Sequence, residues 1–290
     1  MDPISYFQAV VLGLLQGVSE LFPISSLGHS VVLPALFGWN IHQNDDYFVT
    51  FLVATHFATA LVLLGFFRAD WARIVRGLWR SLQAREVAAD DADAKLGWLI
   101  VVATIPAGLL GLVLEHPLRH VFASAQTAAI FLFLNGLMLF GAERLRRRAP
   151  EHVPEGPRSD VVIAKRLDFR RALGIGTAQA LALIPGLSRS GASMSGGLLA
   201  GLSNEDSARF AFLLATPIIG AAALLKLPEL FGPHGDHVRG QALVAALCAA
   251  VTAYFSVRFL LRFFETNRLT PFAVYCTVVG AALAIGFAVT

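Results

Sequence analysis

The sequence predicts an all-α polytopic membrane protein made of inverted-topology repeats, with about six transmembrane helices plus two re-entrant helix pairs. The first observation is composition. Of 290 residues, 56% are hydrophobic and only 15% are charged, and the mean hydropathy is +0.64. This is too apolar for a soluble domain. The second observation is that two apolar segments, one in each half, are broken by a proline and resemble each other. In membrane proteins that are built from repeats, the binding or catalytic site lies where such broken segments meet.

The two broken segments are 13–30, GLLQGVSELFPISSLGHS, and 176–193, GTAQALALIPGLSRSGAS. Their identical positions in a gap-free alignment are Gly13 and Gly176, Gln16 and Gln179, Ser25 and Ser188, Gly28 and Gly191, and Ser30 and Ser193. Farther along, FLVATH from Phe51 resembles FLLATP from Phe212 at nearly the same spacing. The two halves are therefore predicted to be repeats of one design.

The elements follow from the lengths of the apolar runs. The first broken segment has pieces at 4–21 and about 28–37, neither long enough to span about 30 Å of hydrocarbon, so we predict a re-entrant pair. The second pair is predicted at about 171–202. Full spans are expected near 47–67, 96–114, 125–143, 207–227, 241–262 and 270–289.

Basic residues are concentrated in the connections that follow the first, third and fifth predicted spans. By the positive-inside rule these connections face the cytoplasm, so both chain ends lie outside and the two re-entrant pairs enter from opposite sides. We therefore expect a single integral-membrane domain over 1–290. Its first repeat is 1–143, its solvated cytoplasmic linker 144–170 and its second repeat 171–290.

The second break carries an arginine in apolar sequence, which is costly unless the arginine is paired or functional. Arg189 follows the Pro185-Gly186 interruption, and its planar guanidinium suits phosphate oxygens. Free N–H groups of the restarting helix can add to this binding. The neighbouring hydroxyls are those of Ser188, Ser190 and Ser193. The structural alternative is a proline-kinked helix with one snorkelling arginine.

The first break combines a carboxylate, two hydroxyls and an imidazole within ten residues, at Glu20, Ser25, Ser26 and His29. Each can be structural by itself. Together, opposite Arg189, they predict phosphoryl transfer. A serine nucleophile can use His29 or Glu20 as its base, or Glu20 and Gln16 can hold a hard divalent cation. The sequence has no P-loop or dinucleotide fingerprint, so nucleotides and nucleic acids are not expected ligands.

These motifs resemble those of the undecaprenyl-diphosphate phosphatases, also called bacitracin-resistance proteins. The first motif is Gln16-Gly-Val-Ser-Glu20 with Ser25, Ser26, Gly28 and His29, and the second is Pro185-Gly186-Leu187-Ser188-Arg189-Ser190-Gly191-Ala192-Ser193. The resemblance implies an enzyme of the bacterial inner membrane that removes the terminal phosphate of undecaprenyl diphosphate and so recycles the lipid carrier of peptidoglycan synthesis. It also implies a divalent cation, Mg²⁺ or Ca²⁺, and a site that opens to the periplasmic side. Ser193 replaces the usual threonine, and Gln16 is the less acidic of two permitted residues.

We assign Ser26 as the nucleophile, because it stands where the repeats differ and precedes His29 by one helical turn. His29 is then the acid or base, Glu20 orients the serine or binds metal with Gln16, and Arg189 holds phosphate. Attack by water activated by Glu20, with Ser26 only binding phosphate, is the alternative. The remaining predicted substrate-binding residues are Gln16, Ser25, Gly186, Ser188, Ser190, Gly191 and Ser193.

Two other functions compete with the enzyme. A lipid transporter or flippase can also be built on inverted repeats, but it does not need the full set of Glu20, Ser26 and His29 opposite Arg189. A scaffold protein needs none of these residues. The expected partners are a polyprenyl diphosphate lipid and membrane lipids, with a homodimer left open.

Overall fold

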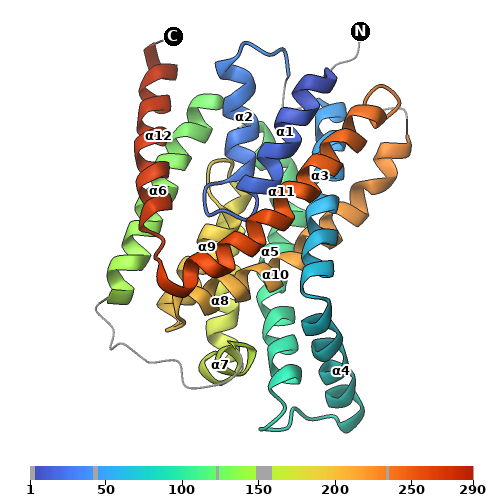
Figure 1. Cartoon of the computed structure of the whole chain (residues 1–290), viewed down its shortest axis with the longest axis vertical. Coiled ribbons are helices and arrows are strands. Elements are labelled where there is room, and N and C mark those ends of the chain that lie inside the picture. The colour runs from blue at the N-terminus through green and yellow to red at the C-terminus, as the bar shows by residue number, and fades with distance from the viewer. Residues whose placement is uncertain (1–3, 42–44, 122–123, 148–158, 233–234, 290) are drawn as a thin grey trace.

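The computed structural model describes residues 4–41, 45–121, 124–147, 159–232 and 235–289, and within these ranges the chain is helical and contains no β-strand (Figure 1). Six described helices are long and apolar enough to cross a membrane. They are α3 (Asp46–Phe66), α5 (Ala92–Val121), α6 (Ala125–Arg147), α10 (Asn204–Lys226), α11 (Arg239–Thr266) and α12 (Thr270–Val289). The predicted polytopic all-α class and its six spans are confirmed.

Four shorter helices form the two broken pairs. The first pair is α1 (Tyr6–Ser19) and α2 (Ser26–Leu36), and the second is α8 (Phe169–Ala180) and α9 (Arg189–Leu199), with the 3₁₀ turn η1 (Leu181–Leu183) between them. The longest, α1, has 14 residues. At 1.5 Å per residue it is about 21 Å long, too short to cross the hydrocarbon layer. Each pair therefore has the length of a re-entrant hairpin.

The second helix of each pair starts in the same way. The hydroxyl of Ser25 accepts the N–H of Gly28 at 3.2 Å, and the hydroxyl of Ser188 accepts the N–H of Gly191 at 3.1 Å. Both serines cap orphan N–H groups of the first helical turn. Helices α2 and α9 also begin and end at aligned positions of the gap-free comparison. These correspondences are consistent with the predicted repeat.

The packing of the first helices corresponds as well. Helix α1 packs along α11, while α8 packs along α5, so each pair lies against a span from the other half of the chain. The aligned glycines Gly13 and Gly176 make this possible, because a Cβ at either would collide with the backbone of Ala245 or Ala103. The two halves are thus interleaved.

Two helices fall where the sequence predicts connections. Residues 68–84, expected as part of a basic loop, form α4 (Arg68–Ala84), with Ile74, Gly77 and Ser81 buried. The prediction of a solvated linker over 144–170 is wrong for α7 (Ser159–Arg166), which packs on α5 and α10 and buries Ile163. The central part of that linker, 148–158, lies outside the described residues. Both α4 and α7 lie at the end of the molecule opposite the start of α1 and the end of α12 (Figure 1).

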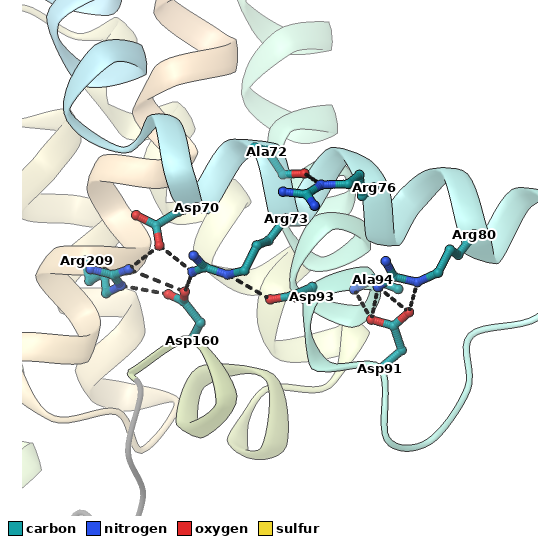
Figure 2. A network of polar contacts seen from close by, with 10 residues as sticks. All are labelled: Asp70, Ala72, Arg73, Arg76, Arg80, Asp91, Asp93, Ala94, Asp160 and Arg209. Atoms are coloured by element: carbon teal, nitrogen blue, oxygen red, sulfur yellow. Dashed lines mark hydrogen bonds and ion pairs between the residues drawn. The ribbon is translucent and has the colours of Figure 1, made fainter.

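An ion cluster explains why α7 docks (Figure 2). Its members are Asp70 and Arg73 of α4, Asp160 of α7 and Arg209 of α10. Arg73 lies 2.5 Å from Asp70 and 2.8 Å from Asp160, and Arg209 lies 2.8 Å from Asp70 and 2.7 Å from Asp160. Burial alone would raise the pKa of Asp160, but hydrogen bonds and charge from Arg209 and Arg73 outweigh it and hold that pKa below its ordinary value. The cluster joins helices from both halves of the chain.

Candidate active site

The two breaks meet at one ion pair. Glu20 follows the last residue of α1, and Arg189 is the first residue of α9. The guanidinium Nη2 of Arg189 donates to Oε1 of Glu20 at 2.6 Å, and the side chains are only 16% and 6% exposed. In this environment a charge needs a partner. The structure therefore brings together the two charged residues that the sequence placed in opposite halves.

The second carboxylate oxygen of Glu20, Oε2, has three neighbours. It accepts a short hydrogen bond from the hydroxyl of Ser26 and another from Nε2 of Gln16 at 3.1 Å. Nε2 of His56 lies 3.5 Å away. Glu20 is therefore the hub of the site, and its bond to Ser26 has the arrangement of a hydroxyl nucleophile beside its base.

The backbone that positions Ser26 is unusual. The preceding residue, Ser25, has φ +70°, a left-handed conformation that non-glycine residues seldom adopt. Such a residue costs on the order of 1–3 kcal/mol and persists where the surrounding structure enforces it. Here the strained turn ends the first break and directs the Ser26 hydroxyl to Glu20.

His29 does not join this group. Its Nδ1 donates to the backbone carbonyl of Ser25 at 2.7 Å, and its Nε2 accepts from the hydroxyl of Tyr275 at 2.8 Å. The two rings are also stacked, with centroids 5.8 Å apart. Both ring nitrogens are engaged away from Ser26, so this geometry does not support the predicted proton transfer. A spacing of three residues places two side chains on one helix face, but the bond to Ser25 turns this ring toward α12.

The imidazole beside Glu20 is instead that of His56, which sequence analysis missed. It lies on α3, and its Nδ1 donates to the carbonyl of Leu52 at 2.8 Å, which leaves Nε2 facing Glu20. One signal was present, because a lone histidine within a membrane span favours a functional role. The repeat comparison concealed it, since the residue aligned with His56 is Pro217.

Asn135 of α6 holds the two breaks together. Its side-chain nitrogen donates to the carbonyl of Pro23 at 2.9 Å, and its side-chain oxygen accepts the N–H of Ser188 at 3.0 Å. The residue is fully buried. One amide thus satisfies a backbone group of each interrupted segment, which would otherwise be costly in an apolar interior.

The predicted hydroxyls of the second break have mainly structural contacts. Ser188 Oγ lies 3.0 Å from Ser190 Oγ, and Ser190 also donates to the carbonyl of Phe22 at 3.0 Å. Ser193 donates to Oε1 of Gln179 at 3.5 Å. Gly186 has φ +102°, which suits glycine and forms the turn before α9. These residues build the frame that carries Arg189.

Part of the polar group lines a cavity of about 310 Å³. Its other walls are mostly apolar and come from α3, α5 and α10, for example Leu52, Ala107 and Ile218. The predicted site residues that line it are Glu20, Ser25, Ser26, Ser188 and Arg189. Those that stand outside its lining are Gln16, His29, Gly186, Ser190, Gly191 and Ser193. A polar end with apolar walls suits an amphiphile with an anionic head group.

The described residues do not form a complete cation site. Among them no group of three or more histidine, cysteine, aspartate or glutamate side chains could hold a metal. Glu20 is the single carboxylate, and Gln16 turns its amide nitrogen to it, which is a donor and not a ligand. This set does not fit a cation held by the protein alone. It fits Mg²⁺ bound by one carboxylate together with phosphate oxygens of a substrate.

Comparison with known proteins agrees with this chemistry. The family model described as bacitracin resistance protein BacA matches residues 9–282. Undecaprenyl-diphosphatase 2 of Frankia alni is 45% identical, with 100% of both chains covered. Undecaprenyl-diphosphatase of Mycolicibacterium paratuberculosis is 49% identical over 96% of each chain, and undecaprenyl-diphosphatase 2 of Burkholderia ambifaria is 44% identical over 93% of each.

Proposed function

Since the chain belongs to the bacitracin resistance protein BacA family, we infer that it is an undecaprenyl-diphosphatase, a membrane hydrolase that converts undecaprenyl diphosphate to undecaprenyl phosphate and inorganic phosphate. This reaction recycles the lipid carrier of peptidoglycan synthesis and is the basis of bacitracin resistance. The observation that carries the inference is the buried group of Glu20, Ser26 and Arg189 at the polar end of an apolar cavity.

Arg189 is the proposed phosphate ligand. Its Nη2 is bound to Glu20, whereas its Nη1 is buried and has no hydrogen-bond partner within the described ranges of the chain. A buried donor without a partner is destabilising, and a phosphate oxygen in the cavity would satisfy it with a charge-assisted bond. The lipid chain then occupies the apolar walls.

Ser26 is the proposed nucleophile. As its oxygen bonds to the terminal phosphorus, its proton passes to Glu20, and the bond between that phosphorus and the bridging oxygen breaks. Undecaprenyl phosphate leaves with the bridging oxygen and the electron pair of that bond. Water then hydrolyses the phosphoserine, which releases inorganic phosphate and restores the hydroxyl. In the alternative, Glu20 activates water directly and Ser26 only binds phosphate.

A divalent cation, Mg²⁺ or Ca²⁺, is proposed to enter with the diphosphate. Glu20 would supply the protein's anionic ligand, and Gln16 would require the opposite amide orientation to add its oxygen. When bound, the cation would offset negative charge on the phosphate oxygens.

We further propose that the protein lies in the bacterial inner membrane with its cavity open to the periplasmic side. Two features support this orientation. The basic segment that forms α4 lies at the end opposite the chain termini, as the positive-inside rule expects for a cytoplasmic end. The cavity is lined by the first turns of α3, including Phe48 and Val49, which precede the α4 end of that span. A homodimer stays a prediction.

The enzyme and the transporter differ in a simple assay. Purified protein in detergent is expected to release inorganic phosphate from farnesyl diphosphate in the presence of Mg²⁺, because hydrolysis needs no membrane to cross. The matched control is the Glu20→Gln variant, which keeps the side-chain shape but weakens the base. Folded wild-type protein that releases no phosphate at any Mg²⁺ or Ca²⁺ concentration, yet moves the lipid between leaflets of vesicles, would favour a flippase.

A further inference from the structure

The aligned glutamines of the two repeats have different surroundings. In the first repeat, Gln16 donates through Nε2 to the carboxylate of Glu20, four residues later. In the second repeat the residue four positions after Gln179 is Leu183. The carboxylate that satisfies the first glutamine therefore has no counterpart beside the second.

Gln179 is nevertheless buried, with only 2% of its surface exposed. Its Oε1 accepts from the hydroxyl of Ser193, while its Nε2 has no hydrogen-bond partner among the described residues. A buried amide nitrogen in this state is destabilising unless a ligand or water completes it. The side chain lines the cavity, as Leu183 does, whereas Gln16 does not.

Arg189, which also lines this cavity, has a second unsatisfied donor. Its Nη1 is buried and, like Nε2 of Gln179, has no hydrogen-bond partner in the part of the chain that the structure describes. Ser26 lines the same cavity, but its hydroxyl is bound to Glu20. The carboxylate of Glu20 is therefore occupied by donors of the protein, whereas Gln179 and Arg189 each keep one unpaired donor. Two unpaired donors on residues that line one cavity favour an anion with several oxygens.

We propose that Gln179 is a substrate-binding residue, which donates through Nε2 to an oxygen of the diphosphate that Arg189 Nη1 also holds. The proposal rests on the function inferred above and deepens it. The diphosphate would accept the hydrogen bond from Gln179, just as the Glu20 carboxylate accepts one from Gln16. Both halves of the chain then have the same amide donor, and in the second half the ligand stands in place of the carboxylate.

The test compares Gln179→Met with Gln16→Met. Methionine has a similar size and no hydrogen-bond donor. Binding of a methylene-bridged farnesyl diphosphonate, which cannot be hydrolysed, is measured by calorimetry, and farnesyl diphosphate turnover gives KM and kcat. Gln179→Met is expected to weaken analogue binding and raise KM roughly ten- to a hundredfold, the effect of one hydrogen bond to a charged group. Gln16→Met should mainly lower kcat, because it releases Glu20 while leaving the unpaired donors of Gln179 and Arg189 in place.

A second variant guards against misfolding. Gln179→Glu keeps the shape and can still accept from Ser193, but its carboxylate would repel the diphosphate, so analogue binding should fall at least as far as in Gln179→Met. Unchanged analogue affinity in either folded variant would overturn the proposed role of Gln179. The proposed phosphatase function would still stand in that case, provided that the wild-type protein turns over farnesyl diphosphate. Wild-type protein without phosphatase activity would instead defeat the proposed function itself.

Discussion

The ion cluster and the polar group at the cavity both hold charge away from water, and they differ in what surrounds their unpaired nitrogens. In the ion cluster of Asp70, Arg73, Asp160 and Arg209, each arginine lies within 3 Å of both aspartates. Nε of Arg73 has no hydrogen-bond partner among the described residues, but it lies 3.6 Å from the carboxylate of Asp93. At the cavity, Arg189 has one carboxylate partner, and its Nη1 has no hydrogen-bond partner among the residues that the structure describes. The unpaired nitrogen of Arg73 thus lies beside a third carboxylate, whereas that of Arg189 belongs to a residue that lines the cavity and can receive a ligand.

The largest expected effect separates the roles of the two adjacent serines at the cavity. Ser26→Ala should reduce kcat by about a thousandfold or more, because it removes the group proposed to attack phosphorus. Ser25→Ala should cause a partial loss, since Ser25 caps α2 and leaves the Ser26 hydroxyl in place. Phosphate release at saturating farnesyl diphosphate and Mg²⁺ measures both. The reverse order of effects would move the nucleophile to Ser25.

The next effect tests whether Arg189 is more than a partner for Glu20. Arg189→Lys keeps the charge but loses the planar fork that can bind Glu20 and phosphate at once. If one charge-assisted bond of about 1.5–3 kcal/mol is lost, kcat/KM should fall roughly ten- to a hundredfold. The melting temperature should change little. Normal turnover in the folded variant would place Arg189 with the ion cluster as a structural residue.

The smallest effect on activity is expected at the ion cluster, where stability should change instead. Asp160→Asn removes the buried partner of two partly buried arginines, Arg73 and Arg209. Breaking a fully buried pair costs about 3–5 kcal/mol. Because these arginines are partly exposed and keep Asp70 as a partner, the loss should lie at or below the lower limit. The exposed Asp168→Asn is the matched control. Thermal unfolding in detergent measures stability, and turnover per folded molecule should stay within about threefold of wild type.

The pH dependence of unfolding sharpens the same test. The pKa of Asp160 is lower in the folded protein than its ordinary value of about 3.9. Its stabilising contribution is therefore present above pH 3.9 and is lost as the pH falls below it, through the folded pKa. Wild-type protein should lose thermal stability in this window, and the acid-dependent loss should be smaller in Asp160→Asn. Equal acid sensitivity of the two proteins would remove Asp160 from the explanation.

The sequence was sufficient for the spans and the breaks because a bilayer imposes length and apolarity on each segment separately. It did not predict α4 or α7, whose mixed composition gives no such signal. Helix α7 depends on bonds from Asp160 to Arg73 and Arg209, which are 87 and 49 residues away.

The candidate site shows the same difference between what local sequence predicts and what depends on contacts between distant residues. Glu20 and Arg189 stood out because charges are rare in apolar segments. The packing of α3 beside α1 decides which histidine approaches Glu20. The spacing of residues along the sequence does not predict this contact. His29 had the favourable spacing to Ser26 but bonds to Ser25 and Tyr275, while His56 reaches Glu20 from another helix.

The packing of α1 along α11 has a consequence for biogenesis. Ser19 ends α1 and Arg239 begins α11, so about 220 residues must be synthesised between the two helices. At about 5–20 residues per second, the first re-entrant helix waits roughly 10 to 40 seconds for its main neighbour. During that interval the side of α1 that later packs on α11, with Gly13 and Gly17, must be shielded by lipid or by the insertion machinery. A chain that is truncated before α11 should therefore be recognised by membrane quality control rather than persist as a smaller stable protein.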